Sequence, residues 1–135
     1  MEREQIERGI VRLYQEFCPT RRIKKNWDCI FENPDYHLLY TADGDKVIGT
    51  MTCMLFRNPT GRGRDYMMID NIIVHHDYRR NGVARNLLLD AQKFAKKKNC
   101  YKILIVSNRK FTGAQKFYLK QGFENKSSKV YIKHL

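Results

Sequence analysis

The sequence predicts a single α/β domain with a mixed central sheet. Helix-type and strand-type hydrophobic patterns follow one another in the order ααββ–β–α–β–α–β. The run 101–106 is almost wholly apolar, as is typical of a strand that is covered on both faces. Hydrophobic residues make up 42% of the 135 residues, which is enough for one core, and we assign residues 1–135 to one domain.

The expected elements are helices over 2–17 and 24–32, strands over 36–42, 46–57 and 66–74, a helix over 82–98, a strand over 101–106, a helix over 114–121, and a last strand from Phe123 onward that includes Val130, Tyr131 and Ile132. The first two segments carry apolar residues at helical spacing, such as Ile6 and Ile10, and Trp27 and Ile30. The first two strands are joined across Gly44, which accepts a positive φ in a hairpin turn.

The second half of the chain has its own start and stop signals. The polar loop 58–64 precedes the third strand-type run. The helix over 82–98 has an apolar stripe and closes with the lysines 96–98, which are favourable at the negative end of the helix dipole. Gly122 ends the short helix before it, and the apolar run around Tyr131 indicates the last strand.

Positive charge is concentrated in one half of the chain. The net charge is +12, and residues 75–135 hold 15 of the 26 Lys and Arg but only 3 of the 14 Asp and Glu. A basic half favours an anionic partner, which is a nucleic acid, a membrane surface or a polyphosphate ligand. Charge by itself does not choose among them.

Targeting and metal signals are weak in this sequence. No apolar stretch is long enough to cross a bilayer, and no secretory signal opens the chain, so we expect a cytoplasmic protein without a membrane partner. The four cysteines fit neither a CxxC pair nor a zinc knuckle, and we interpret them as reduced thiols. His75 and His76 are strand neighbours that should point to opposite faces, so we expect no shared metal.

The most specific pattern is a strand–turn–helix junction with the sequence Arg79-Arg80-Asn81-Gly82-Val83-Ala84. A glycine at a helix start lets the backbone approach a ligand, and the free N–H groups of the first turn form an anion site. The arginines there, joined by Arg85, suit a pyrophosphate group. The chain has neither a Walker A lysine pattern nor a G-x-G-x-x-G motif after a strand, which disfavours nucleoside triphosphates and dinucleotides.

Three ordered segments resemble the N-acetyltransferases of the GNAT family. Arg79-x-x-Gly82-x-Ala84 is similar to the family's acetyl-CoA signature, Q/R-x-x-G-x-G/A, and the run 69–74 resembles its fourth strand. The segment 113–123 resembles the later pattern A-x-x-F-Y-x-x-x-G-F. The resemblance implies a mixed, mostly antiparallel sheet flanked by helices. Its fourth strand would carry a β-bulge and splay from the fifth.

The same resemblance implies how acetyl-CoA binds. The pantetheine arm would lie between the fourth and fifth strands and bond to the backbone of Ile72, Ile73 and Val74. The pyrophosphate would be held by the backbone N–H groups of residues 79–84. A Lys or Arg that the sequence does not identify would bind the 3′-phosphate. Asn108 resembles a position that contacts the pantetheine or the acceptor, and the alternative is a loop Asn that bonds its own backbone.

The implied reaction is the direct attack of a neutral amine on the thioester in a ternary complex. Tyr118 matches the tyrosine of the family's Phe-Tyr pair, and a phenol with a pKa of about 10 can protonate the leaving thiolate. The alternative for Tyr118 is a core side chain. Asp70 interrupts an apolar strand and is the candidate base or amine-orienting carboxylate. Its alternatives are pairing with an arginine or accepting from the bulge N–H groups.

These residues predict an acetyl-CoA-dependent N-acetyltransferase that needs no metal. The acceptor amine is open, and a small amino-sugar-like molecule is favoured over a protein. We expect its pocket to involve the two N-terminal helices, the loop 58–65 and the strand 66–74. A CoA-binding sensor without turnover and a basic nucleic-acid-binding module are the alternatives. The second lacks a zinc-finger, RRM or KH signature, and a homodimer stays open.

Overall fold

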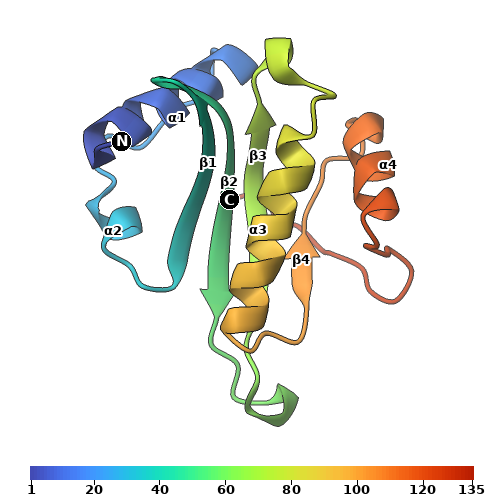
Figure 1. Cartoon of the computed structure of the whole chain (residues 1–135). Coiled ribbons are helices and arrows are strands. Elements are labelled where there is room, and N and C mark those ends of the chain that lie inside the picture. Colours follow the sequence, from blue (N-terminus) through green and yellow to red (C-terminus); the bar gives the residue numbers. More distant parts are fainter. The chain divides into compact units, whose positions relative to one another are not determined.

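The computed structural model describes residues 1–135 (Figure 1). Its elements are α1 (Arg3–Phe17), α2 (Asp28–Phe31), β1 (Tyr36–Asp43), β2 (Lys46–Phe56), the 3₁₀ turn η1 (Gly61–Gly63), β3 (Tyr66–Val74), the 3₁₀ turn η2 (His76–Tyr78), α3 (Val83–Lys97), β4 (Ile103–Ile105) and α4 (Thr112–Lys120). The chain divides into a larger unit, Met1–Leu104, and a smaller one, Ile105–Leu135. Each unit is described by itself.

The sheet has the strand order β1-β2-β3-β4. β1 pairs with β2 and β2 with β3 in antiparallel ladders, whereas β4 runs parallel to β3 (Figure 1). β4 begins beside the start of β3, where the Met67 N–H donates to the Lys102 carbonyl at 3.2 Å. The prediction of a mixed, mostly antiparallel sheet flanked by helices is confirmed.

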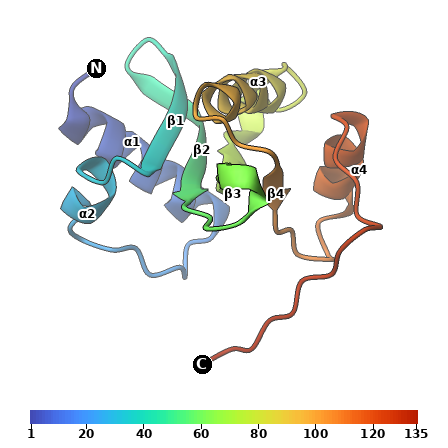
Figure 2. The same ribbon diagram turned by 90° about the horizontal axis from the view of Figure 1, so that it is seen from below.

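Helices cover both faces of the sheet, with α1 and α2 on one face and α3 on the other (Figure 2). The α1 side is filled by Ile10, Leu13 and Trp27, which pack with residues of β2 and β3. On the other side α3 approaches β2 closely at Gly49. A Cβ built at that position would lie 2.6 Å from a methyl carbon of Val83, so only glycine leaves room for the helix.

The second helix is shorter than predicted, because residues 24–27 are not helical. The Trp27 indole N–H donates to the Lys24 carbonyl at 2.7 Å, and the Asn26 side chain accepts from the Asp28 N–H at 2.9 Å. An Asn side chain that accepts from the N–H two residues later closes a turn of its own in place of a helical turn. The helix therefore begins at Asp28, and the chain before it stays open as a loop.

The smaller unit consists of α4 and the segment that follows it. Gly122, with φ +93°, turns the chain after α4, and the Phe123 N–H donates to the Tyr118 carbonyl at 3.1 Å. The predicted last strand from Phe123 is wrong, because no strand forms there and Tyr131 is 90% exposed. Val130, Tyr131 and Ile132 make an apolar run of three residues between lysines, and a strand is stable only with a ladder partner.

None of the helices combines the length and the apolar content that crossing a membrane requires. The four cysteines, at positions 18, 29, 53 and 100, are free thiols. Burial raises the pKa of the Cys53 thiol to about 12, so this side chain acts as a small apolar residue of β2.

We predict that His37 makes stability depend on pH. Its ring stacks on Phe94 of α3 with 4.3 Å between the ring centroids. Burial, and then the charge of Lys98, lower the pKa of His37 below its ordinary 6.5. The unfolded chain therefore takes up this proton at a higher pH than the folded one, and stability is lost as the pH falls from 6.5 through the lower folded pKa.

His37→Phe keeps a stacked ring and removes the titration. Its free energy of unfolding in urea should change less between about pH 7.5 and about pH 5 than that of the parent protein. The same pH dependence in both proteins would show that His37 contributes nothing to it.

Candidate functional site

A β-bulge interrupts the middle of β3. Thr50 of β2 pairs with Ile73, and Thr52 pairs with Asp70, so one residue of β2 faces two of β3. Of these two, Asn71 has φ +52°, a left-handed conformation that Asn tolerates better than most residues. The bulge implied by the family resemblance is confirmed.

Asp70 lies beside the bulge and takes part in its structure. Its Oδ1 accepts from the Asn71 N–H at 2.8 Å, which is one of the alternatives that the sequence left open. Asp70 is exposed. Because paired residues of antiparallel strands point to the same face, its side chain shares the α1 face with Thr52. The other carboxylate oxygen remains available for an amine or a water.

The last part of β3 has one unpaired edge. On one side, residues 73–74 continue the ladder with β2. On the other side, β4 starts opposite Met67 and ends at Ile105, after three residues. A parallel strand of that length does not reach Ile72, so the backbone groups of residues 72–74 on this side are not used by β4. With three residues, β4 is much shorter than the nine-residue β3.

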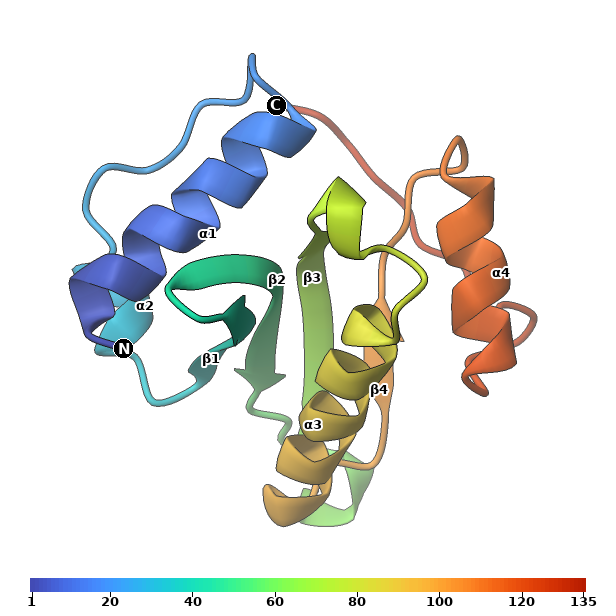
Figure 3. The same cartoon turned by 45° about the horizontal axis from the view of Figure 1, so that its top comes forward.

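The segment that connects β3 to α3 (Figure 3) is held by two side-chain hydrogen bonds. The Tyr78 hydroxyl donates to Asp43 Oδ2 at 2.6 Å, which also raises the pKa of Tyr78. The Arg79 Nε donates to the Val74 carbonyl at 3.2 Å. Gly82, with φ +79°, then starts α3, and a Cβ at this position would meet no atom within 4 Å. The backbone at Gly82 is therefore open to an incoming group.

The start of α3 is positively charged and has no side-chain cap. Its first turn contains no acidic residue, and Arg80 and Arg85 are exposed and form no ion pair. Val83 is buried and Ala84 half-buried, whereas Asn81 is exposed. Uncapped N–H groups at a positive helix end bind anions. The predicted strand–turn–helix junction is present, with Gly82 as the residue that precedes α3.

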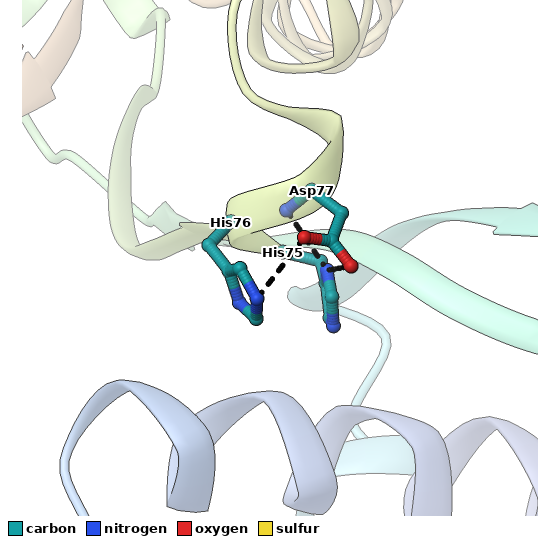
Figure 4. Close-up of side chains that lie close together, drawn as sticks. All are labelled: His75, His76 and Asp77. Carbon is teal, nitrogen blue, oxygen red and sulfur yellow. Dashed lines mark hydrogen bonds and ion pairs between the residues drawn. The ribbon is translucent and has the colours of Figure 1, made fainter.

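Three titratable side chains gather just before this segment (Figure 4). The prediction that His75 and His76 point to opposite faces is wrong, because β3 ends at Val74 and the chain turns, so the two rings stack with centroids 4.4 Å apart. The buried His75 accepts from the Asp77 N–H through Nδ1 at 3.1 Å, and its Nε2 lies 3.4 Å from a Glu16 oxygen. Both nitrogens are engaged, and His75 ties the end of β3 to α1.

A pocket lies between the α1 side and the sheet, and we call it the helix–sheet pocket. It has a volume of about 180 Å³. Its lining consists of the cations Arg21, Arg22 and Lys24, the polar residues Tyr14, Tyr36, Thr52 and Asn71, and the apolar residues Ile23, Trp27, Ile30 and Leu38. The pocket therefore includes the bulge residue and the loop between α1 and α2. No residue of the loop 58–65, which the sequence suggested, lines it.

Two hydroxyl groups of the pocket stay protonated over the physiological range. Burial raises the pKa of Tyr14, and the negative charge of Asp70 adds to this, whereas a hydrogen bond from Thr52 and the charge of Arg21 lower it. Burial and Asp70 likewise raise the pKa of Tyr36. These effects place the Asp70 carboxylate within electrostatic reach of both hydroxyls, which can donate hydrogen bonds to a ligand.

The remaining predicted residues, Tyr118 and Asn108, belong to the smaller unit. The Tyr118 ring lies 5.8 Å from the Phe117 ring and 6.4 Å from the Phe123 ring, between centroids. Asn108 Oδ1 accepts from the Lys110 N–H at 3.1 Å, and its carbonyl accepts from Gln115 at 2.8 Å. The side chain of Asn108 therefore makes the local backbone bond that the sequence offered as the alternative.

The sequence led us to expect the two N-terminal helices and the strand 66–74 at the acceptor pocket, but it did not identify the individual residues that α1 and the following loop contribute. Tyr14 belongs to an apolar helical stripe, which is typical of a core residue. Arg21 and Arg22 lie in a charged segment between two helices, which is typical of a solvent-exposed linker. The only signal was a cluster of four cations, Arg21, Arg22, Lys24 and Lys25, in a half of the chain without net charge. Arg57, at the end of β2, pairs with Asp35 at 2.7 Å and with Asp65 at 3.1 Å and does not line the pocket.

Comparisons with known proteins agree with this geometry. Residues 4–123 match the model of the acetyltransferase (GNAT) family. Glucosamine 6-phosphate N-acetyltransferase from Trypanosoma brucei brucei is 30% identical over 78 residues, which are 58% of this chain and 51% of that protein. The match thus spans about half the length of this curated relative.

Solved structures share the fold. A putative acetyltransferase from Agrobacterium tumefaciens str. C58 has a TM-score of 0.85 at 22% identity, with 94% of this chain and 92% of that chain covered. Glucosamine-6-phosphate N-acetyltransferase from Arabidopsis thaliana has a TM-score of 0.79 at 18% identity, with 98% and 94% covered.

We predict that the bulge needs a residue that tolerates a left-handed backbone. Asn71→Val puts a β-branched side chain at φ +52° and should lower the free energy of unfolding by about 1–2 kcal/mol. Asn71→Gly accepts the same φ and is the matched control, which should lose clearly less. Urea unfolding of the three proteins measures the difference. If the Val variant is as stable as the Gly variant, the bulge does not have this backbone conformation.

Proposed function

Because the chain belongs to the acetyltransferase (GNAT) family, we propose that it transfers an acetyl group from acetyl-CoA to the primary amine of a small, amino-sugar-like molecule. The observation that carries the proposal is the bulged β3, whose free edge leads to the uncapped, arginine-rich start of α3. The relative named glucosamine 6-phosphate N-acetyltransferase supports the choice of an amino sugar.

The residues present fit acetyl-CoA. Its pyrophosphate would be held by the backbone N–H groups of residues 79–84, where Gly82 leaves open space and no acidic side chain opposes an anion. Its pantetheine arm would bond to the backbone of Ile72, Ile73 and Val74 along the edge that β4 does not use. Arg80 and Arg85 are exposed cations near the same place in the chain.

Acetyl-CoA supplies an activated acetyl group, and side chains of the protein accept and donate the protons of the reaction. An alkylamine has a pKa of about 10 and must lose a proton before it can attack. In our proposal Asp70 orients this amine and accepts the proton, directly or through a water, with the oxygen that does not bond to Asn71. Tyr118 donates a proton to the departing thiolate. Asn108 contributes a contact to the pantetheine or the acceptor.

We predict that charge at position 82 decides cofactor affinity. Gly82→Asp and Gly82→Asn have nearly the same shape, and both residues tolerate the positive φ of this position. Only the Asp variant adds a negative charge beside the pyrophosphate. It should bind acetyl-CoA at least about 10-fold more weakly than the Asn variant in a calorimetric titration, because a like charge is placed beside an anion.

The Asn variant is the control for side-chain volume and backbone strain. Equal affinities of the two folded variants would show that the pyrophosphate does not bind at this helix start.

We predict that Tyr118→Phe slows turnover without weakening cofactor binding. The phenol acts on charge that develops as the C–S bond breaks, so kcat should fall by about 10²–10⁴-fold while the affinity for acetyl-CoA changes little. Release of the CoA thiol in the presence of glucosamine 6-phosphate measures the rate.

Tyr131→Phe removes a hydroxyl from an exposed tyrosine of the same unit and should leave the rate unchanged. A folded Tyr118→Phe protein with the parent rate would remove Tyr118 from the mechanism. Binding of acetyl-CoA without thiol release, for every primary amine offered, would indicate a sensor instead of an enzyme.

A further inference from the structure

All the charged residues that line the helix–sheet pocket are cations. Arg21, Arg22 and Lys24 line it, and no carboxylate does. None of these three cations forms an ion pair. Three acidic residues near these cations in the chain already have partners, because Glu16 lies 3.4 Å from His75, Asp28 pairs with Arg3 and Asp35 pairs with Arg57. The pocket therefore presents uncompensated positive charge to whatever enters it.

Negative charge lies beside the pocket at the bulge. Asn71 and Thr52 line the pocket, and Asp70, which pairs with Thr52, lies next to Asn71 in the chain. Tyr14 lines the same pocket, and the charges of Asp70 and Arg21 act on the pKa of its hydroxyl in opposite directions. A ligand that fits this field has a positive or proton-donating group at one end and a negative group at the other.

We propose that the acceptor is a primary amine that carries a phosphate monoester. Arg21, Arg22 and Lys24 hold the phosphate, while the amine lies at the bulge beside Asp70. This rests on the proposed function and adds the anionic group and its binding residues. A phosphate monoester carries a charge of about −1.5 to −2 at pH 7, and three cations suit it better than a singly charged carboxylate. One guanidinium group can also donate two parallel hydrogen bonds to two oxygens of the same phosphate.

The same field disfavours other amine classes. Acceptors with several ammonium groups, such as polyamines, would place positive charge against the three cations. A neutral amino sugar would find its amine partner but would leave the cations without one. The charge of the loop between α1 and α2 therefore sets the specificity, and it does so at a distance from the reacting amine.

The test compares amines that differ in charge. Glucosamine 6-phosphate and glucosamine share the amine and differ by the phosphate, and spermidine is the cationic probe. We expect kcat/KM for glucosamine 6-phosphate to exceed that for glucosamine by about 100-fold or more, with spermidine lowest, since charge-assisted hydrogen bonds contribute about 10-fold each. Similar values for the two sugars would overturn the proposal.

Substitutions locate the phosphate. Arg21→Gln and Arg22→Gln should each raise KM for glucosamine 6-phosphate by about 10-fold with little change in kcat, because contacts far from the reacting atoms affect ground state and transition state alike. Neither should lower kcat/KM for glucosamine by a comparable factor or raise KM for acetyl-CoA. Lys97→Gln removes an exposed cation from the far end of α3 and is the control. Variants that behave like this control would overturn the proposal.

A binding measurement separates this inference from the proposed function. Calorimetry with saturating CoA, and no acetyl donor, should show glucosamine 6-phosphate bound and glucosamine not, with the affinity reduced in Arg21→Gln. If this holds but no amine is acetylated, the anion site stands and the proposed reaction fails. If amines are acetylated without preference for the phosphate, the reaction stands and the anion site fails. Absence of binding in the presence and in the absence of CoA also overturns the inference.

Discussion

In the middle of β3 the backbone turns left-handed at Asn71, and the Asp70 carboxylate accepts the N–H of that residue, so two residues of β3 face one of β2. This bulge changes which side chains reach the α1 face. It brings Asn71 to the pocket and keeps Asp70 on the same face as Thr52. Beyond it, β3 leaves the short β4 and runs on toward the start of α3. Both halves of the proposed site therefore depend on one local irregularity.

The charges of the larger unit are arranged around that irregularity. Positive charge stands at two places, the uncapped start of α3 and the loop between α1 and α2, and Asp70 stands between the two segments in the order of the chain. In our proposals the first place binds the anionic cofactor and the second the anionic acceptor. The carboxylate then meets the only group of the acceptor that needs a base. In these proposals the cofactor and the acceptor each bind through their own cluster of cations.

Several predictions from the sequence failed for reasons that are local and physical. Trp27 shares an apolar face with Ile30, yet its indole N–H donates to the Lys24 carbonyl within a loop, and the helix begins only at Asp28. His75 and His76 have strand spacing, but the strand ends one residue earlier and the rings stack. The run around Tyr131 has strand composition and no partner strand. In each case the residue types fit the predicted element, but the neighbouring backbone or the lack of a partner strand prevented that element from forming.

The sequence by itself determined the order of the elements as far as α4, the junction at Gly82 and the family. Hydrophobic period and glycine position are encoded residue by residue, so they can be read without the fold. The bulge was reached through the family resemblance, since nothing in the run 69–74 marks Asn71 as left-handed. Only the tertiary structure decided that Tyr14, Arg21, Tyr36 and Thr52 share one pocket. A pocket wall depends on which distant segments pack together, and no local pattern records that.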